Sequence, residues 1–495
     1  MNAKRIIAVL LTVMIILVGV CSCSGSVTTP DSTVASDNRA KETTESTAAI
    51  DDDGWKEIKD DLPDDLTFGA TDFTILLRDT SPYREEFDSD TQGSILDSAV
   101  MRRNMIVEDR LNISLVFDEQ FGDYSQYKNF NLLINKSVNA GDQTWDAVAA
   151  YAAGIIAEGI NGSFANLHSV NYLNLEKPYW NPSVNEQFTI AGKLFYITGD
   201  ISPLLIGQSI VFFENLKLAE DLNVENIYSL VKEKEWTHEK LLSIIKNVYS
   251  DKNGNNIKDK EDLWGLTCPL NSQVDAFHAS YNVPINRKNA SGELEFAFEE
   301  EAVIKLYDRV HELLVDCEGT WAKSDYANDV ATDYLAHFAA DGALFTVNRL
   351  YTVTTDLTDM TSNYAILPYP MADKDQSEYI TYAWNQYTMI SIPRDISSFD
   401  KSGAVIEALA SASQNVVTPA YYELALKSQY SRDAESSQMI DIITSNIRIE
   451  YLFLQSNVIF FIRNHIKSGT TSIASQYKAV SKTYQKTFQT ILKNY

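Results

Sequence analysis

Histidine and cysteine, the residues that most often carry nucleophilic or metal chemistry, are scarce in this chain. It has six histidines and four cysteines among 495 residues. It lacks a G-x-S-x-G nucleophile motif, a G-x-x-x-x-G-K-[ST] phosphate loop and a metal-binding histidine pair, and the HELL stretch at 311–314 lacks the second histidine of a metalloprotease helix. These absences exclude the enzyme classes that local motifs identify. The paired carboxylates of a glycosidase are positioned by the fold, so that chemistry stays open.

Basic residues are also few. Lysine and arginine number 41 against 68 aspartates and glutamates, and the formal net charge is −27. Such a charge repels polyanions, which excludes nucleic acid as a partner, and it is also ordinary for a soluble exported protein. The 26 tyrosines and seven tryptophans are a more positive indication, because aromatic faces can stack on flat apolar surfaces of a ligand, although most will lie in the core.

The only long hydrophobic run lies at the N-terminus. Lys4 and Arg5 precede fifteen residues without a charge, Ile6 to Val20, which is short for a membrane span of about 20 residues. Small residues follow this run, and it is not followed by a basic stop-transfer cluster. The pattern predicts an export signal over residues 1–23, with an ordinary anchor helix as the alternative.

Two of the four cysteines end this signal. Ser22 before Cys23, and Val20 three residues before it, are similar to the lipobox of bacterial lipoproteins, whereas Cys21 has the bulky Val20 at its cleavage position. We therefore expect Cys23 to carry the lipid, with Cys21 as the alternative. This would anchor an exported protein to the outer face of the bacterial cell membrane.

Residues 24–64 begin with a stretch of Ser, Thr, Asp and Ala that cannot bury enough apolar surface to fold, so they predict a flexible acidic tether. The remaining body of roughly 440 residues is long enough for two or three domains. It contains two cysteines, Cys268 and Cys317. An exported protein could join them in a disulfide, and two free thiols are the alternative.

The body alternates strand-like and helix-like segments. Strands are predicted over 73–77, 113–117, 145–151, 194–198, 209–213, 343–347, 364–367 and 387–392. Between them lie amphipathic helices, one starting at Ser94 with Asp97 as its capping-box partner, and the last 90 residues favour helix. Arg103 interrupts the apolar stripe of that helix, and we expect it to reach solvent rather than pair with a buried carboxylate. The alternation predicts an α/β fold with parallel sheets covered by helices.

The segment DKNGNNIKDKED at 251–262 has the oxygen-ligand spacing of a calcium loop. The predicted ligands are Asp251, Asn253, Asn255, the carbonyl of Ile257, Asp259 and Asp262. Asn256 stands where glycine is usual, but asparagine tolerates a left-handed backbone, and the side chain of Ile257 is expected to pack inward. We expect structural Ca²⁺ here, with a solvated turn rich in Asn and Asp as the alternative.

Six motifs in order resemble a known family. They are WDAVAAYAAG (145–154), KPYWNPS (177–183), KLFYITGDISPL (193–204), EWTHEKLLSIIKNVYSDKNGN (235–255), DGALFTVNRL (341–350) and YAILPYPMADKDQSEYI (364–380). Together they resemble extracellular solute-binding proteins of carbohydrate ABC transporters, in the maltodextrin-binding class, and the calcium loop is similar to that of alginate-oligosaccharide-binding members. The likeness extends from about residue 65 to the end of the chain.

This resemblance implies two α/β lobes, periplasmic-binding-protein-like, each with a mixed, mostly parallel sheet flanked by helices and joined by a hinge of crossing strands. It places residues 65–206 and 344–386 in an N-terminal lobe, and residues 207–343 and 387–495 in a C-terminal lobe. Ligands of such sheets lie beyond the carboxyl ends of the strands. The ligand-binding residues expected there are Arg78, Tyr83, Tyr151, Asp200, Arg349, Tyr351, Trp384 and Asn385. Trp180 is either a ligand platform or a structural plug.

The resemblance implies a monomeric, non-catalytic lipoprotein that captures an oligosaccharide or another polar solute and delivers it to ABC transporter permease subunits. Two alternatives stay open. An exported polysaccharide hydrolase would release products from glycans, and a surface adhesin would bind no small ligand.

Overall fold

The computed structural model describes residues 57–89, 93–322, 330–427, 434–455 and 457–495. The predicted export signal, both of its cysteines and most of the predicted tether lie outside the described residues. Residues 57–64, which we assigned to the tether, pack against the body. Leu62 is buried, and Asp60 forms an ion pair with Arg110 at 2.6 Å. The packed chain therefore starts earlier than the composition indicates.

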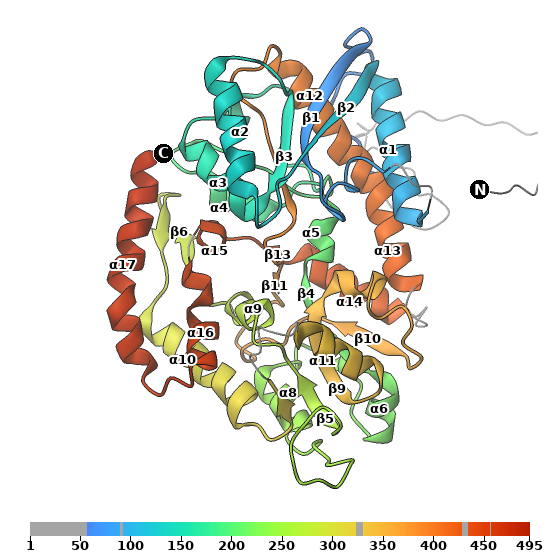
Figure 1. The fold of residues 1–495 in the computed structure, drawn as a ribbon, viewed down its shortest axis with the longest axis vertical. Coiled ribbons are helices and arrows are strands. Elements are labelled where there is room, and N and C mark those ends of the chain that lie inside the picture. Colours follow the sequence, from blue (N-terminus) through green and yellow to red (C-terminus); the bar gives the residue numbers. More distant parts are fainter. Residues whose placement is uncertain (1–56, 90–92, 323–329, 428–433, 456) are drawn as a thin grey trace, which may run out of the picture. The chain divides into compact units, whose positions relative to one another are not determined.

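The first sheet has the strand order β12-β3-β1-β2 (Figure 1). Its strands are β1 (Thr71–Arg78), β2 (Ile113–Gln120), β3 (Ala147–Tyr151) and β12 (Thr388–Ser391). β1 pairs in parallel with β2 and with β3, and β12 is antiparallel to β3. The strands expected near 73, 113 and 145 are confirmed. Because β1, β2 and β3 run in one direction, their carboxyl ends meet at one edge of this sheet.

The second sheet has the order β10-β4-β9-β5-β8. Its strands are β4 (Ile210–Asn215), β5 (Trp264–Thr267), β8 (Thr320–Trp321), β9 (Ala343–Arg349) and β10 (Tyr364–Leu367). β9 is parallel to β5 and antiparallel to β4, so this sheet is mixed. Two small sheets pair β11 (Thr381–Tyr382) with β13 (Ile447–Arg448), and β6 (Asn286–Lys288) with β7 (Leu294–Phe296).

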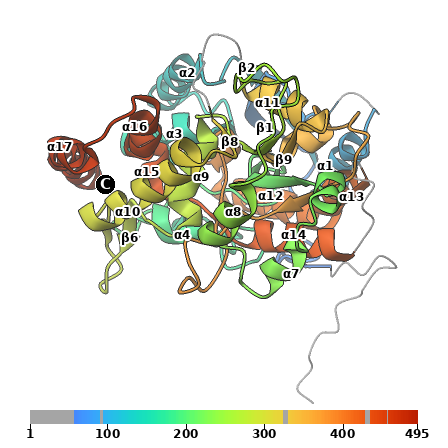
Figure 2. The same ribbon diagram turned by 90° about the horizontal axis from the view of Figure 1, so that it is seen from below.

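Helices cover both sheets, as alternating α/β segments predict. The α-helices are α1 (Ile95–Leu111), α2 (Tyr127–Ala140), α3 (Ala152–Ile160), α4 (Pro182–Phe188), α5 (Leu204–Gly207), α6 (Leu216–Asp221), α7 (Ile227–Lys232), α8 (His238–Ile245), α9 (Ser272–Ser280), α10 (Glu300–His311), α11 (Val330–Ala339), α12 (Phe399–Ala412), α13 (Thr418–Lys427), α14 (Ala434–Ser445), α15 (Tyr451–Gln455), α16 (Phe461–Lys467) and α17 (Ile473–Asn494). Short 3₁₀ or π turns are η1 (Leu167–Ser169), η2 (Glu312–Asp316), η3 (Leu350–Thr354), η4 (Ser413–Val417) and η5 (Asn457–Phe460). The C-terminal part is mainly helical, as expected, and α17 lies beside α10 (Figure 2).

We call the first sheet with its helices the first lobe, and the second sheet with its helices the second lobe. The predicted lobe boundaries assign two segments to the wrong lobe. The stretch containing β9 and β10, assigned to the first lobe, pairs with β4 in the second sheet. β12, assigned to the second lobe, pairs with β3 in the first sheet. All three strands are apolar and buried, and such a run fits either sheet equally well, so only the pairing partner decides its lobe.

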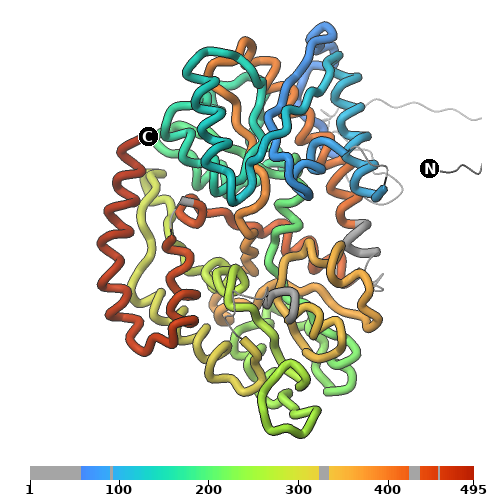
Figure 3. The backbone as a smooth tube through the Cα atoms, viewed as in Figure 1, coloured from blue at the N-terminus to red at the C-terminus, as the bar shows by residue number. Residues whose placement is uncertain are grey.

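Two segments carry the chain between the sheets, and their path can be followed in Figure 3. The first leads through residues 199–209 into β4, and the second leads from β11 through residues 383–387 into β12. They touch each other where Ser209 pairs with Ala383. The strand predicted over 194–198 forms only an isolated bridge, between Ile197 and Ile390. This part of the prediction is wrong, because the segment lies beside β12 of the first sheet but pairs with it at one residue only and forms no ladder.

Local signals in the sequence set the helix ends. Ser94 caps α1, and the Asp97 carboxylate accepts a hydrogen bond from the Ser94 amide, which confirms the predicted capping box. Arg103 on the same helix is 0% exposed, against the expectation that it reaches solvent. Its guanidinium donates to Asn104 Oδ1 at 2.8 Å, and burial lowers its pKa to about 10. η4 and α12 pack on this face of α1 and close the route to solvent.

Candidate ligand site

The structure brings together seven of the eight predicted ligand residues. We call them the aromatic–arginine cluster: Arg78, Tyr83, Tyr151, Arg349, Tyr351, Trp384 and Asn385. Arg78 ends β1 and is buried, with its guanidinium carbon 3.9 Å from the centre of the Tyr83 ring. Its Nη2 donates to Thr388 Oγ1 at 2.6 Å and to the Gln386 carbonyl at 3.2 Å. The Tyr83 hydroxyl donates to the Gln386 side chain. The end of β1 is thus joined to the second crossing segment.

Tyr151 provides a second link of this kind. It ends β3, and its hydroxyl donates to Asn385 Oδ1 at 3.1 Å. Two tyrosines after β2 pack against it edge-on, Tyr127 with ring centres 6.0 Å apart and Tyr124 at 6.4 Å. Burial raises the pKa of Tyr151, so its hydroxyl stays protonated and can donate. Aromatic faces beside polar groups suit a ligand that has both an apolar face and hydroxyls.

Arg349 and Tyr351 come from the second lobe, and Trp384 lies on the second crossing segment. Arg349 ends β9, and its guanidinium carbon lies 4.9 Å from the centre of the Trp384 ring. Tyr351 follows in η3, and Arg349 and Tyr351 both act electrostatically on Tyr83. The Trp384 amide donates to the carbonyl of Gln208 at 2.8 Å, which joins the two crossing segments. The cluster therefore combines side chains from both lobes at the point where the chain crosses between them.

Sequence reasoning missed several members of this site. Tyr124 and Tyr127 follow β2, and Tyr124 is 69% exposed. The rule that loops after parallel strands converge would have found them, since it had already selected the loops after β1 and β3. Gln386 and Gln208 had no comparable signal. The Gln208 side chain is buried and its Oε1 has no hydrogen-bond partner among the described residues, so it is an acceptor that water or a ligand could use.

A buried carboxylate, Glu86, lies next to the cluster and accepts hydrogen bonds from the chain segments that carry it. Glu86 is 2% exposed, and it accepts hydrogen bonds from the hydroxyls of Ser202 and Thr388. The amide of Leu204 also donates to it, at 3.1 Å. Burial raises the pKa of Glu86, while the positive charge of Arg78 opposes that rise. One side chain of the first lobe thus holds the first crossing segment and the start of β12, where the second crossing segment ends.

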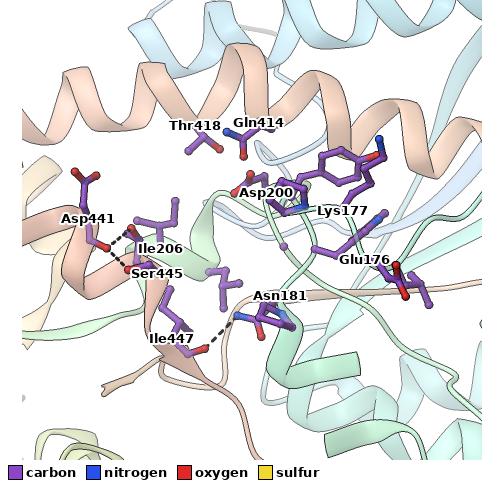
Figure 4. Close-up of a pocket in the computed structure, with 18 of the residues that line it drawn as sticks. Glu176, Lys177, Asn181, Asp200, Ile206, Gln414, Thr418, Asp441, Ser445 and Ile447 are labelled. Atoms are coloured by element: carbon purple, nitrogen blue, oxygen red, sulfur yellow. Dashed lines mark hydrogen bonds between the residues drawn. The ribbon is translucent and has the colours of Figure 1, made fainter. Parts of the chain in front are cut away.

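Asp200, the eighth predicted ligand residue, lies elsewhere. Its amide donates to the Tyr179 carbonyl at 2.9 Å, and its side chain lines a pocket of about 540 Å³ to which no residue of the cluster contributes (Figure 4). The prediction placed it at the end of a strand over 194–198, but the chain turns at this point. Trp180 is buried, and its Nε1 donates to Glu407 at 3.1 Å. It is a structural plug, although it borders the same pocket.

The loop over 251–262 has the backbone that a calcium loop needs at its turn. Asn256 is left-handed, with φ of 57°, as expected. The Asp251 carboxylate accepts from the amides of Gly254 and Asn256 at 2.7 and 2.8 Å, and Asp262 accepts from the Lys252 amide at 3.2 Å. The Ile257 side chain is 62% exposed, so the expectation that it packs inward is wrong. Among the described residues, no group of three or more Asp, Glu, His or Cys side chains is placed to hold a metal ion, so the arrangement of this loop leaves the calcium prediction untested.

The two cysteines of the body are free thiols. Cys268 is buried beside β5, and Cys317 lies at the end of η2 and is partly buried. Burial raises the pKa of Cys268, so its thiol is protonated and unreactive.

Buried carboxylates are expected to make the folded state less stable as pH rises. Burial raises the pKa of Asp275, Glu407 and Glu450 to about 7 and that of Glu214 to about 8. The folded state therefore holds protons that the unfolded chain has released above pH 4 to 5, roughly the usual range for carboxyls. The stability that these protonated carboxyls contribute is fully present below the pKa that they have in the unfolded chain. It is lost as pH rises through about 7 to 8, their pKa in the folded state.

We therefore expect the free energy of unfolding to fall steadily between about pH 5 and pH 8. Urea unfolding at the two pH values measures this. Glu407→Gln should flatten the dependence, because it removes one titrating group. A stability that stays constant or rises over this interval would contradict the expectation.

No family model matches the sequence, and no curated protein matches it by sequence. Solved structures do match the fold. The GacH receptor of Streptomyces glaucescens is 14% identical with a TM-score of 0.52, over 86% of this chain and 99% of that one. The maltose/maltodextrin-binding domain MalE from Bdellovibrio bacteriovorus is 12% identical with a TM-score of 0.52, over 84% and 100%. A family 1 extracellular solute-binding protein from Alicyclobacillus acidocaldarius is 11% identical with a TM-score of 0.53, over 85% and 100%.

The chain has the two-lobed fold of extracellular solute-binding proteins. This confirms the predicted fold class. In the solute-binding fold of this chain, the aromatic–arginine cluster occupies the junction of the lobes. Within the described ranges, no helix combines the length and the apolar character that crossing a membrane requires.

Proposed function

We propose that the chain is a substrate-binding protein that captures an extracellular oligosaccharide between its two lobes and delivers it to an ABC permease without chemical change. The observation that carries this proposal is the composition of the aromatic–arginine cluster. Arg78, Tyr83 and Tyr151 come from the first lobe, and Arg349 comes from the second. A ligand that touches both sets of side chains stabilises the closed arrangement of the lobes, whereas a ligand that touches one set does not.

The chemistry of the cluster suits a sugar. Pyranose rings have an apolar face that stacks on Trp384 or Tyr124, and hydroxyls that pair with arginine and amide groups. Two of the structural neighbours support this choice, since GacH has been solved in complex with acarbose and MalE bound to maltotriose.

Lipid anchoring on Cys23 completes the proposal. A lipid would hold a monomeric receptor at the outer face of the bacterial membrane near its permease, with the residues after the cysteine as a tether. Mass spectrometry of the membrane-extracted protein tests this. A diacylated N-terminal Cys23 is expected, and a first residue at Cys21 or an intact leader would contradict it.

The binding function is tested by a thermal-shift screen over oligosaccharides, followed by calorimetry and product analysis. A receptor should gain about 2.7 kcal/mol of stability when its ligand is present at roughly 100 times Kd. The sugar should be recovered unchanged with a stoichiometry of one. Hydrolysis products would favour the polysaccharide hydrolase, and a screen without any stabilising sugar would favour the adhesin.

We also propose that the loop over 251–262 binds a structural Ca²⁺. The ion would be held by Asp251, Asn253, Asn255, the Ile257 carbonyl, Asp259 and Asp262, and it would offset the repulsion among the three carboxylates. Adding a chelator should lower the melting temperature by several degrees, and excess calcium should restore it.

Asp251→Asn should make the melting temperature insensitive to both additions. The matched control is Asp221→Asn on α6, where the carboxylate pairs with Lys217 at 3.2 Å on the surface and the chelator response should persist. A wild-type protein that does not respond to the chelator would contradict the metal assignment.

A further inference from the structure

The pocket that contains Asp200 is separate from the aromatic–arginine cluster. One wall is formed by residues 175–182 and the first crossing segment, and the other by the starts of η4 and α13 with the end of α14 (Figure 4). The Asn181 side chain reaches across to the carbonyl of Ile447 at 3.2 Å. The volume of about 540 Å³ is within the range of small-molecule sites.

The charge in this pocket is negative and lacks a positive partner. Asp200 and Asp441 line it, and neither makes an ion pair among the described residues. The one basic residue at its edge, Lys177, is held by Asp61 at 2.6 Å. Burial raises the pKa of Asp200 to about 7, which is the energetic consequence of a carboxylate placed where no cation compensates it.

A second polar group in the pocket also lacks a regular partner. Thr418 at the start of α13 is 4% exposed, and its Oγ1 has no hydrogen bond of ordinary geometry among the described residues. It lies close enough to Asp200 to lower the pKa of that carboxyl somewhat. A ligand atom that donates hydrogen bonds to both oxygens would satisfy two groups that the protein leaves incompletely paired.

Apolar side chains complete the lining. Leu205 and Ile206 come from the first crossing segment, Ile447 from β13, and Pro178 from the opposite wall. A strongly hydrated metal ion gains nothing from such a surface, whereas an organic cation can bury its carbon chain there. The lining therefore favours an ammonium compound.

We propose that this pocket is a second binding site, which takes a small organic cation with its ammonium group on Asp200 and Thr418 and its carbon chain against Leu205 and Ile206. The ammonium group donates to the Asp200 carboxylate, and no bond is made or broken. The occupant differs in charge and in place from the sugar proposed for the cluster, so the two sites are independent in their tests.

The test uses n-butylammonium chloride as the cationic probe and 1-butanol as its neutral equivalent, titrated into the intact protein by calorimetry and by ligand-observed NMR. We expect saturable binding of the amine and at least about tenfold weaker binding of the alcohol, because a charge-assisted hydrogen bond is lost. Binding of the amine should strengthen as pH rises through about 7, where Asp200 ionises.

Asp200→Asn, which keeps the shape of the side chain, should weaken the amine about tenfold or more and leave sugar binding intact. Thr418→Val should weaken it several-fold. Asp221→Asn on the surface should change nothing, and Trp384→Ala should impair the sugar without affecting the amine. Equal binding of amine and alcohol, no saturable binding of either, or an Asp200→Asn protein that binds the amine normally would each overturn the proposal.

Discussion

Glu86→Ala should destabilise the protein by about 3–5 kcal/mol, the usual cost of breaking a buried charge arrangement by removing one partner. Glu86 is the carboxylate that acts on both buried guanidiniums, those of Arg78 and Arg103. Its loss removes from both guanidiniums, which burial keeps from solvent, the carboxylate that acts most strongly on each of them. It also removes the acceptor for Ser202 and Leu204 on the first crossing segment and for Thr388 at the start of β12.

Urea unfolding followed by tryptophan fluorescence measures this effect. Glu86→Gln keeps the size of the side chain and part of its accepting capacity, so we expect an intermediate loss of stability. Asp221→Ala serves as the control, since an exposed i,i+4 pair contributes under about 0.5 kcal/mol. If Glu86→Ala lost no more than this control, the buried carboxylate would not be what holds these segments.

Trp384→Ala should weaken binding of the cognate sugar by roughly 30-fold or more, which corresponds to about 2 kcal/mol for a central aromatic anchor. Trp384 lies on the second crossing segment, and Arg349 of the second lobe packs on its ring at 4.9 Å. Alanine removes the stacking surface and also the aromatic partner that orients the arginine.

Calorimetry with the sugar found in the screen measures the change in Kd, and circular dichroism verifies that the variant is folded. Trp384→Phe retains an aromatic face and should lose only a few-fold. Tyr172→Ala removes an exposed tyrosine that is not a member of the cluster, so Kd should not change. Unchanged affinity in Trp384→Ala would remove Trp384 from the ligand site.

Much of the local structure could be read from the sequence, because local rules decide it. The capping box at Ser94, the left-handed Asn256 and the strand over Tyr364–Leu367 follow from side chains and backbone preferences within a few residues. Candidate site residues could also be selected, since loops at the carboxyl ends of parallel strands converge. That rule brought Arg78 and Tyr151 to the same place as Arg349, across more than 190 residues of chain.

The sequence did not show in this way which distant segments pack against or pair with one another. Arg103 looked like a surface residue because the sequence does not show what covers its helix. Asp200 was assigned to the cluster because the apolar run before it resembled a strand, whereas that run forms a single bridge to β12 and the chain turns at Asp200.

The sequence by itself determined an acidic α/β body that lacks the local motifs of catalysis, since composition and short-range pattern carry that information. Only the tertiary structure decided which lobe receives β9, β10 and β12, because buried strands of similar composition fit either sheet. It also decided that Glu86 holds the first crossing segment and the start of β12, and that Asp200 lines a pocket of its own. Both depend on contacts between residues more than 100 positions apart, which packing selects and local pattern does not encode.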